Sequence, residues 1–245
     1  MKPKALVLAK SLLWCVVILL FPIISGALSV ILSLDTVAAL FLQGAFMILA
    51  LIPPAVFAFK GKRDRSACGF ARIDREGCKR ALYFLPLLVI FIPPAMKGFY
   101  VKSAGYVLGS LLLYLFVGIA EEVYFRGVIP RYLKEAFSTM GIVLLSSVIF
   151  AIGHIAATLA GSTAFEVALT VLNAFIFGWL AIEMTILSSS IIPAILVHFF
   201  FDFETKITVM NGRELLTAEI VRGILMFILA GWLAAVIISE FKIRK

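Results

Sequence analysis

Residues 104–125 read AGYVLGSLLLYLFVGIAEEVYF, an apolar run long enough to cross a bilayer that carries two adjacent glutamates near its end. A membrane-spanning helix needs about 20 mostly apolar residues. Similar runs occur along the whole chain of 245 residues, of which 63% are hydrophobic and only 15% are charged. Soluble domains have about 25% charged residues, and membrane barrels have short alternating segments instead. The sequence therefore predicts an all-α, polytopic integral membrane protein.

The apolar pattern predicts about eight transmembrane helices in one domain, at residues 11–31, 36–59, 81–96, 104–125, 141–160, 164–187, 191–203 and 220–241. The third and seventh of these are short for a full span and contain proline, so we expect them to be tilted, broken or partly buried in protein. Pro53–Pro54 and Pro93–Pro94 mark predicted kinks or helix ends. The first run is long and seven more follow, which favours a retained first helix over a cleaved signal peptide.

The distribution of lysine and arginine predicts the orientation. With a cytoplasmic N-terminus, 17 of the 22 basic residues fall on the cytoplasmic side, in line with the positive-inside rule. Both termini are then cytoplasmic, in the plasma membrane of a prokaryote or the endoplasmic reticulum of a eukaryote. This topology accounts for the net charge of +8, so no nucleic-acid partner is expected. Membrane lipids are the expected partner of the basic loop 60–80, KGKRDRSACGFARIDREGCKR.

The three cysteines, Cys15, Cys68 and Cys78, show no metal-type pairing. Two of them lie in the basic loop that we place in the cytoplasm, where disulfides are disfavoured. We therefore expect free thiols.

Five ionisable residues lie in strongly apolar stretches: Glu121, Glu122, His154, His198 and Asp202. A charged side chain at the centre of a membrane helix costs about 2.5–3.5 kcal/mol on insertion scales, so facing all five toward lipid would cost on the order of 10 kcal/mol. We expect them instead to face one another or a wet cavity. Carboxylates and imidazoles that share a shielded pocket are typical of a site that activates water.

The first of the polar motifs is GIAEEVYFRG at residues 118–127. Glu122 and Arg126 are four residues apart, so on a helix they share a face and form an ion pair. Glu121 is rotated by about 100° and meets a different neighbour. We therefore expect Glu122 to be a paired carboxylate and Glu121 to be available as a base. Taken alone, the motif also fits a salt-bridged helix end at the membrane interface.

The other two motifs are FAIGHIA, with Phe150 and His154 one turn apart, and HFFFD, with His198 and Asp202 one turn apart. Alone, the first fits a packing histidine and the second a local histidine–aspartate hydrogen bond. Together the three motifs predict that spans far apart in the sequence converge on one site.

The order EExxxR, FxxxH, HxxxD resembles the signature of the CPBP family (CAAX protease and bacteriocin-processing, or Abi) of intramembrane glutamate proteases, which includes the type II CAAX prenyl endopeptidases. In this chain the elements are Glu121–Arg126, Phe150–His154 and His198–Asp202. The resemblance implies a catalytic core in helices 4–7, residues 104–203. Residues 1–103 then form N-terminal helices with the basic loop, and residues 204–245 form a loop and the last helix.

The resemblance also implies roles for these residues. Glu121 is the general base on a water, helped by His154, while Glu122 is held by Arg126 and supports the site. His198 and the residue at 202 polarise the scissile carbonyl and stabilise the oxyanion. CAAX-cleaving relatives often have asparagine at the last position, whose amide donates a hydrogen bond. Asp202 donates only when protonated, and when ionised it orients His198 instead, so its role and the substrate class stay open.

Metal chemistry is the competing reading of the same residues. His154, His198 and a carboxylate match a two-histidine, one-carboxylate zinc site. The sequence has no HExxH motif, and the resemblance implies a site without metal, with zinc as the alternative to test. Among other polar residues in apolar runs, Asn173 is expected to hydrogen-bond between helices, and Glu183 receives no catalytic role.

The sequence thus predicts an intramembrane endopeptidase that acts on membrane-attached protein tails, including prenylated ones, or on transmembrane peptides, in a cavity that opens to the cytoplasm. One alternative is a non-catalytic membrane adaptor or bacteriocin-immunity protein. A second is a proton-coupled transporter, because buried glutamates and histidines also build proton relays. The absence of an inverted repeat in the sequence disfavours the transporter. The natural substrate and the oligomeric state are left open.

Overall fold

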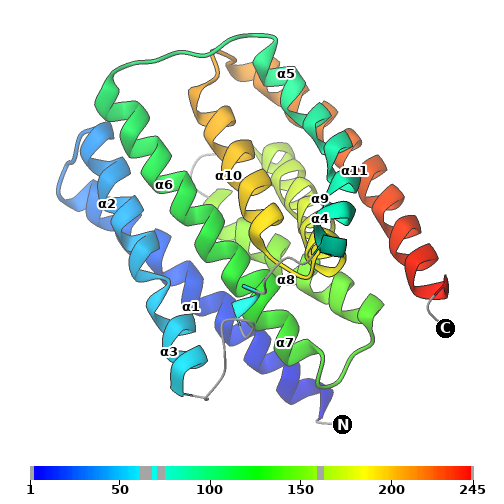
Figure 1. Ribbon diagram of the computed structural model, residues 1–245. Helices are drawn as coiled ribbons and strands as arrows, with labels where there is room; N and C mark the ends of the chain where they lie inside the picture. The colour runs from blue at the N-terminus through cyan, green and yellow to red at the C-terminus, as the bar shows by residue number, and fades with distance from the viewer. Residues whose placement is uncertain (1–2, 61–67, 71–74, 159–162, 244–245) are drawn as a thin grey trace.

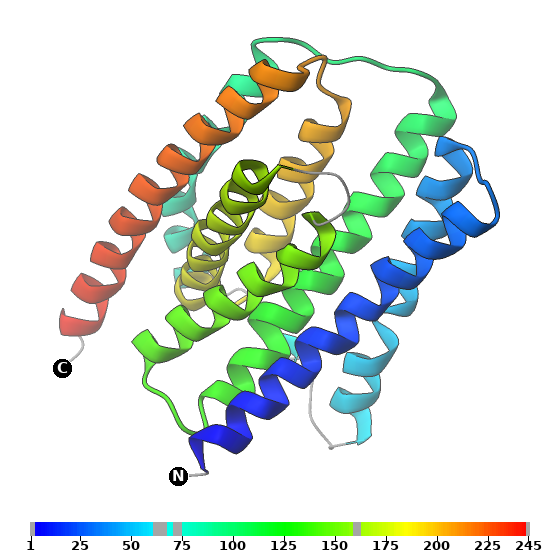
Figure 2. The ribbon, with the colours of Figure 1, turned by 180° about the vertical axis from the view of Figure 1, so that it is seen from behind.

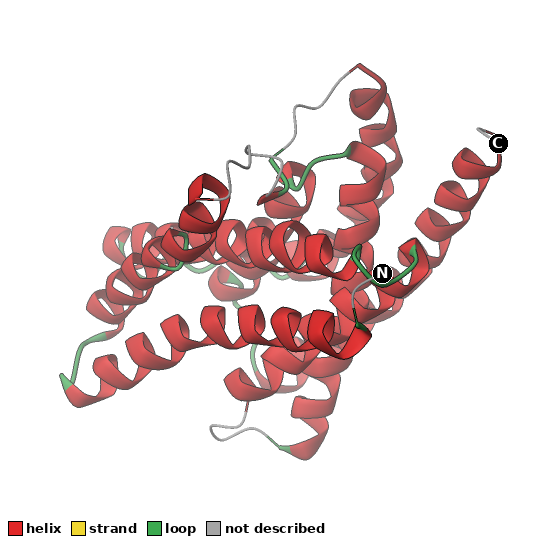
Figure 3. Cartoon of the chain, turned by 90° about the horizontal axis from the view of Figure 1, so that it is seen from below, coloured by secondary structure: helices red, strands yellow, loops and turns green. Residues whose placement is uncertain are grey.

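The computed structural model describes residues 3–60, 68–70, 75–158 and 163–243, and within these ranges the chain is almost entirely helical with no strand (Figure 3). A single isolated bridge pairs Phe99 with Thr208. The helices are α1 (Lys4–Ile31), α2 (Thr36–Leu49), α3 (Ile52–Lys60), α4 (Arg75–Ala81), the 3₁₀-helix η2 (Leu82–Phe91), α5 (Ile92–Ala95), α6 (Ala104–Glu122), the π-helix η3 (Val123–Val128), α7 (Ile129–Leu133), α8 (Thr139–Thr158), α9 (Ala164–Ser188), α10 (Ile192–Ile207) and α11 (Gly212–Ile243).

All eight predicted apolar segments are helical, which confirms the all-α polytopic class. Six helical runs in the described residues are long and apolar enough to cross a membrane: Lys4–Ile31, Thr36–Ala58, Arg75–Ala95, Ala104–Leu133, Ala164–Ser188 and Gly212–Glu240. The third segment is longer than predicted, because α4 continues directly into η2 and α5. The seventh segment, α10, is short as predicted, with 16 residues.

The break between α2 and α3 has a local cause. Pro54 has no backbone N–H, so the carbonyl of Ala50 loses its helical donor. The hydroxyl of Tyr124, from η3, donates to that carbonyl at 2.9 Å. The proline break is thus closed by a side chain from the element that follows the two glutamates, and Pro53–Pro54 marks a helix end as predicted.

The π-helix η3 directly follows Glu122. Pro130 lacks the N–H that would bond to the carbonyl of Arg126, and the turn before it is wound as a π-helix instead of an α-helix. The hydroxyl of Ser146 on α8 donates to the carbonyl of Phe125 at 2.7 Å within this segment. Single π-turns inside α-helices occur frequently at functional sites.

The helices form one bundle in which α6 runs through the middle (Figure 1). It packs against α2 on one side and α10 on the other, while α9 packs against α8 and α11. Both termini lie at the same end of the bundle in the two opposite views of Figures 1 and 2, and the connections after α1, α5 and α10 lie at the other end.

The backbones of α6 and α10 approach closely at Gly118. A Cβ atom there would lie 3.3 Å from the carbonyl oxygen of Ile195 and 3.3 Å from the nitrogen of Phe199. Glycine therefore permits this contact, and it lies one turn before Glu122 and beside His198. The close approach brings the glutamate pair of α6 within reach of the histidine of α10.

The basic loop 60–80 lies only partly within the described residues, and its charges at 61–67 and 71–74 fall outside them. The backbone N–H of Ile191 donates to the carbonyl of Gly69 at 3.1 Å, and the thiol of Cys68 lies 3.5 Å from the carbonyl of Pro54. Cys68 is buried, which raises the pKa of its thiol. All three cysteines are free, as predicted.

Candidate active site

His198 is the centre of the candidate site, because three carboxylates surround its ring. Nδ1 lies 2.8 Å from Oε1 of Glu122. On the opposite side of the ring, Nε2 lies 3.6 Å from Oε2 of Glu121 and 3.5 Å from Oδ2 of Asp202. Two adjacent glutamates of one helix therefore contact the two nitrogens of one imidazole on another helix.

Glu122 also pairs with Arg126, whose Nη1 lies 3.1 Å from Glu122 Oε1. Both side chains are fully buried. This confirms the ion pair predicted from the spacing of four residues. Glu122, Arg126 and His198, here called the catalytic cluster, form a continuous chain in which the arginine fixes a carboxylate and the carboxylate fixes an imidazole.

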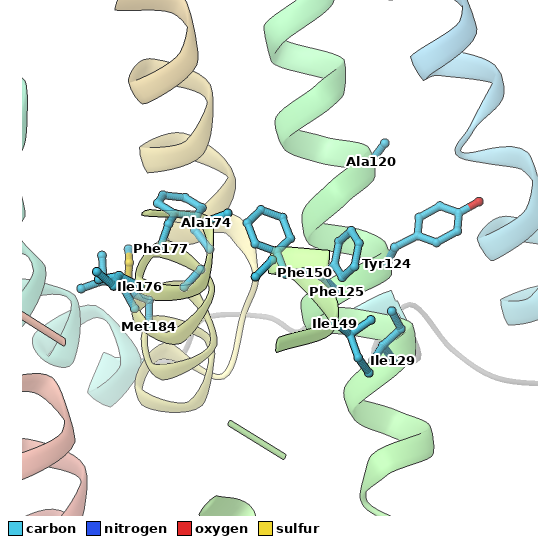
Figure 4. Packing of buried hydrophobic residues seen from close by; sticks show 14 of the residues in the cluster. Ala120, Tyr124, Phe125, Ile129, Ile149, Phe150, Ala174, Ile176, Phe177 and Met184 are labelled. Carbon is cyan, nitrogen blue, oxygen red and sulfur yellow. The ribbon is translucent and has the colours of Figure 1, made fainter. Parts of the chain in front are cut away.

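Aromatic rings enclose the catalytic cluster. Figure 4 shows Phe125, Phe150 and Phe177 in a row between η3 and α9. The guanidinium carbon of Arg126 lies 4.3 Å from the ring centre of Phe150, and the ring of His198 lies 4.8 Å from that of Phe177. The phenylalanine of FxxxH thus covers a buried arginine, and such a desolvated cation–π contact contributes about 2 kcal/mol.

A cavity of about 220 Å³ lies beside His198. It is lined by Phe150, His154, Thr170, Asn173, Ala174, Phe177, His198, Phe201, Asp202, Thr205 and Glu219. Nδ1 of His154 lies 3.0 Å from the carbonyl of Phe150. A carbonyl only accepts, so Nδ1 carries a proton, and in the neutral ring Nε2 is the acceptor.

The structure brings the three motifs together. His154, His198 and Asp202 line the same cavity. Glu121 is not among its lining residues, but its Oε2 lies 3.6 Å from Nε2 of His198, which is. The side chain of Glu121 is 20% exposed, and that of Asp202 is 28% exposed. The buried Oε2 of Glu121 has no hydrogen-bond partner among the described residues. Buried carboxylate oxygens normally have a partner, and an ordered water is the usual one where no protein group is near.

Two expectations about the glutamate pair are corrected. The sequence placed the pair at the cytoplasmic end of its span and Arg126 in the turn that follows. Instead the helical path continues through η3 and α7, so the span runs over Ala104–Leu133 and both glutamates and Arg126 lie inside it. Gly127 and Pro130 resemble a loop in sequence, but Gly127 lies in the π-helix η3 and Pro130 in the first turn of α7.

The cavity draws its lining from four helices. Apart from Phe150 and His154 on α8, its lining residues come from α9, α10 and α11. Its opening to the cytoplasm stays a prediction. A second hollow is lined by Arg126, Arg131 and Lys134, among others.

The geometry leaves the metal alternative without a ready set of ligands. Among the described residues, no group of three or more histidine, cysteine, aspartate and glutamate side chains is arranged to hold a metal ion. The two histidines line one cavity, but Nδ1 of His154 is directed to a backbone carbonyl and Nδ1 of His198 to Glu122.

Sequence reasoning missed the polar wall of the cavity on α11. Glu219 lines the cavity, and Arg222 is fully buried next to it. The predicted last helix began at residue 220, whereas α11 begins at Gly212, so Glu219 was read as part of a loop. Asn173 makes the predicted interhelical bond, donating from Nδ2 to the carbonyl of Glu219 at 3.0 Å. Glu183 accepts a bond from Trp179 one turn earlier.

Fold and site together define a multi-pass membrane protein with a carboxylate–imidazole centre buried inside its helical bundle. A family model described as "Type II CAAX prenyl endopeptidase Rce1-like" matches residues 103–203, the stretch from the start of α6 into α10. Over these residues the match confirms the relationship that the three motifs predict. At the level of the family, it indicates a protease of the membrane. A search among curated proteins finds no match.

Proposed function

We propose that the protein is an intramembrane endopeptidase in which Glu121 activates a water for attack on a peptide bond. The observation that carries this proposal is the position of His198 between Glu121, Glu122 and Asp202. Two helices far apart in the sequence, α6 and α10, place their ionisable groups around one imidazole. Helix packing alone does not require such an arrangement, since each buried polar group costs free energy unless it is paired.

Glu122 and Arg126 act as positioning residues. The ion pair fixes Glu122, and Glu122 accepts a hydrogen bond from Nδ1 of His198 at 2.8 Å. Nε2 of His198 then faces Glu121 and Asp202 at 3.5–3.6 Å, beyond the 2.7–3.2 Å of an ordinary hydrogen bond. This spacing supports a role in which Nε2–H donates to a third group, the oxygen of the scissile carbonyl.

The reaction follows from these roles. Glu121 takes one proton from water while the water oxygen bonds to the carbonyl carbon, and His198 stabilises the oxyanion that forms. The tetrahedral intermediate then collapses and the C–N bond breaks. The proton held by Glu121 passes to the leaving nitrogen, which regenerates the carboxylate. His154 lines the same cavity and, with Nε2 as acceptor, helps to hold the water or the substrate.

Asp202 is assigned an orienting role. It lies 3.5 Å from Nε2 of His198 on the same face of α10, as its spacing predicted. As a carboxylate it favours the imidazolium form of His198, whose two N–H groups both have carboxylate neighbours. Asp202 thus acts through His198 where an asparagine would donate to the oxyanion directly.

The substrate class that fits is a membrane-attached protein tail, with or without a prenyl group. The cavity of about 220 Å³ is smaller than the roughly 300–1,000 Å³ of sites that enclose a drug-sized ligand. We therefore expect a few residues of an extended peptide to enter it while the lipid anchor or the rest of the substrate stays in the bilayer.

The test is cleavage by the purified protein in lipid nanodiscs. Farnesylated peptides with a C-terminal three-residue tail, and solubilised host membrane proteins, are incubated and the products identified by mass spectrometry. Glu121→Gln keeps the shape of the side chain and should lower the cleavage rate by about 10²–10⁴-fold. Glu214→Gln, at an exposed pair with Lys97, is the matched control and should cleave at the wild-type rate.

Two results would overturn the proposal. A Glu121→Gln protein that cleaves at the wild-type rate removes Glu121 from the chemistry. Stoichiometric zinc in the purified protein, with loss of cleavage on chelation and recovery on zinc addition, replaces the glutamate mechanism by a metal mechanism.

A further inference from the structure

The catalytic cavity has a second ionic wall, and this wall comes from α11, outside the residues that match the family model. Glu219 lines the cavity together with His198 and Asp202. Its side chain is 23% exposed. Thr170, Asn173 and Thr205 also line the cavity, so its wall combines polar side chains with aromatic rings.

Two contacts hold the Glu219 carboxylate in place, and a third holds its backbone. Nη1 of Arg222 lies 3.1 Å from Oε1, and Nδ2 of Asn173 lies 3.4 Å from Oε2 and 3.0 Å from the backbone carbonyl of the same glutamate. Gly223 permits the approach of Asn173, because a Cβ atom at that position would collide with the side-chain oxygen of Asn173. A carboxylate has about four acceptor positions, so Glu219 can still accept further hydrogen bonds from a ligand in the cavity.

Arg222 ties this carboxylate to the turn of α10 that carries Asp202. Its guanidinium donates to Oγ1 of Thr205 at 2.7 Å and to the carbonyl of Phe201 at 3.3 Å. The guanidinium carbon lies 3.4 Å from the ring centre of Phe201, and the side chain is fully buried. Arg222 thus positions Glu219 without itself facing the cavity.

The charge balance of this wall is negative. Arg222 pairs with Glu219 at 3.1 Å and with Glu204 at 3.8 Å, so one cation serves two carboxylates. Among the described residues that line the cavity, Asp202 and Glu219 are the acids, and lysine and arginine do not occur. In a shielded cavity charges interact far more strongly than in water, so a cation is attracted and a carboxylate is repelled.

We propose that Glu219 is a substrate-binding residue of the catalytic cavity that selects a basic side chain of the substrate close to the scissile bond, and that Arg222 is its positioning residue. The proposal rests on the proposed function, since it places the subsite in the cavity where cleavage would occur. The same wall disfavours a free carboxylate or an acidic side chain at that place.

The test uses farnesylated peptides that differ at one position. Each of the three residues after the farnesylated cysteine is in turn Lys, Leu or Glu, and both binding and cleavage are measured in nanodiscs. Binding is measured on the Glu121→Gln protein, which retains Glu219. At one of the three positions we expect Lys to bind about tenfold more tightly than Glu, and the same order in kcat/KM for the protein with Glu121.

Glu219→Gln keeps the size of the side chain and should abolish the Lys-over-Glu preference, mainly through KM. Glu214 lies five residues earlier on the same helix and is exposed, so Glu214→Gln should retain the preference. For Arg222, Lys should preserve more of the preference than Gln, because it retains a cation beside Glu219. A merely structural role would lower the rates of all peptides by the same factor.

The failures of the two proposals are distinguishable. Cleavage at the wild-type rate by the Glu121→Gln protein contradicts the proposed endopeptidase mechanism. The binding preference is measured independently of cleavage and still tests the role of Glu219. A peptide series that binds equally well at all three positions, that does not bind, or whose Lys-over-Glu preference is unchanged by Glu219→Gln overturns the role of Glu219, even when cleavage by Glu121 is intact.

Discussion

Two buried arginines on different helices each pair with a glutamate and stack on a phenylalanine that lines the cavity. Arg126 lies over Phe150 and pairs with Glu122, whereas Arg222 lies over Phe201 and pairs with Glu219. The carboxylate of Glu122 is fully buried and bonds to His198, while that of Glu219 is partly exposed in the cavity wall. In the roles proposed above, the same chemical pair orients a reacting group in one place and shapes the substrate's surroundings in the other.

Substitutions at the two arginines should therefore affect catalysis in different ways. The catalytic cluster lies within the residues that match the family model, and its loss should lower the rate for every substrate. The cluster of Arg222, Glu219 and Glu204, here called the α11 cluster, depends on a helix outside that match, and its loss should change which substrates are preferred. Substitutions in the two clusters test this difference between an effect on rate and an effect on substrate preference.

The largest effect is expected for Arg126→Met. The substitution removes the cation of a buried ion pair and leaves the Glu122 carboxylate to its bond with His198, which costs about 3–5 kcal/mol. It also frees His198 from its fixed orientation, so activity should fall by at least about 10²-fold for all substrates. Thermal unfolding in nanodiscs and single-substrate kinetics measure the two effects.

The double variant Arg126→Met with Glu122→Leu is the control, because it removes both charges. It should recover much of the stability and none of the activity. Recovery of activity as well would mean that the ion pair has no positioning role and would remove the distinction between the two clusters.

The next effect is expected for His154→Gln. His154 lines the cavity and its Nδ1 is directed to the carbonyl of Phe150, so in the neutral ring Nε2 is the nitrogen that can accept a proton. Gln retains an amide donor near that carbonyl but has no titrating group. We expect kcat to fall by about 10²-fold with a thermal midpoint close to that of the wild type.

His154→Gln also tests the other two functional classes. An adaptor should keep its biological activity in this variant, and a proton-coupled transporter should lose substrate uptake without ever giving peptide products. A kcat equal to that of the wild type would restrict His154 to packing against Phe150, whose ring centre lies 4.5 Å away.

A smaller effect on rate is expected for Arg222→Met. The α11 cluster would keep two carboxylates without their cation, so stability should fall by an amount similar to that for Arg126→Met. The rate with a preferred substrate should fall only about tenfold, since no residue of the catalytic cluster is touched. A loss of rate as deep as that of Arg126→Met would show that the two clusters act as one unit.

The sequence predicted the parts of the site that depend on spacing along one helix. A separation of four residues correctly predicted the Glu122–Arg126 pair and the contact between His198 and Asp202. The family resemblance predicted that the motifs converge. It did not predict that both glutamates would contact the same imidazole, since this depends on how closely α6 and α10 approach at Gly118.

The sequence failed where tertiary partners overrule local signals. Arg126, Gly127 and Pro130 read as a turn, but a π-helix with the carbonyl of Phe125 bonded to Ser146 keeps the span continuous. The α11 cluster was invisible for a different reason. Glu204 and Glu219 fell in the predicted loop before the last span, and Arg222 fell just inside that span, while their partners Asn173 and Phe201 come from two other helices.

The smallest effect is expected for Tyr124→Phe, which tests the support behind the catalytic cluster. The hydroxyl of Tyr124 donates to the carbonyl of Ala50, which Pro54 leaves without a helical donor. Without it this buried carbonyl loses its partner, and the free energy of unfolding should fall by about 1–3 kcal/mol. Because Tyr124 lies in η3 next to Glu122, kcat should fall only a few-fold and the Lys-over-Glu preference should not change.

Tyr132→Phe, on the next element of the same span, is the matched control and should leave the thermal midpoint unaltered. A Tyr124→Phe protein that loses the substrate preference but keeps its rate would place η3 with the cavity wall and would contradict the division between the two clusters.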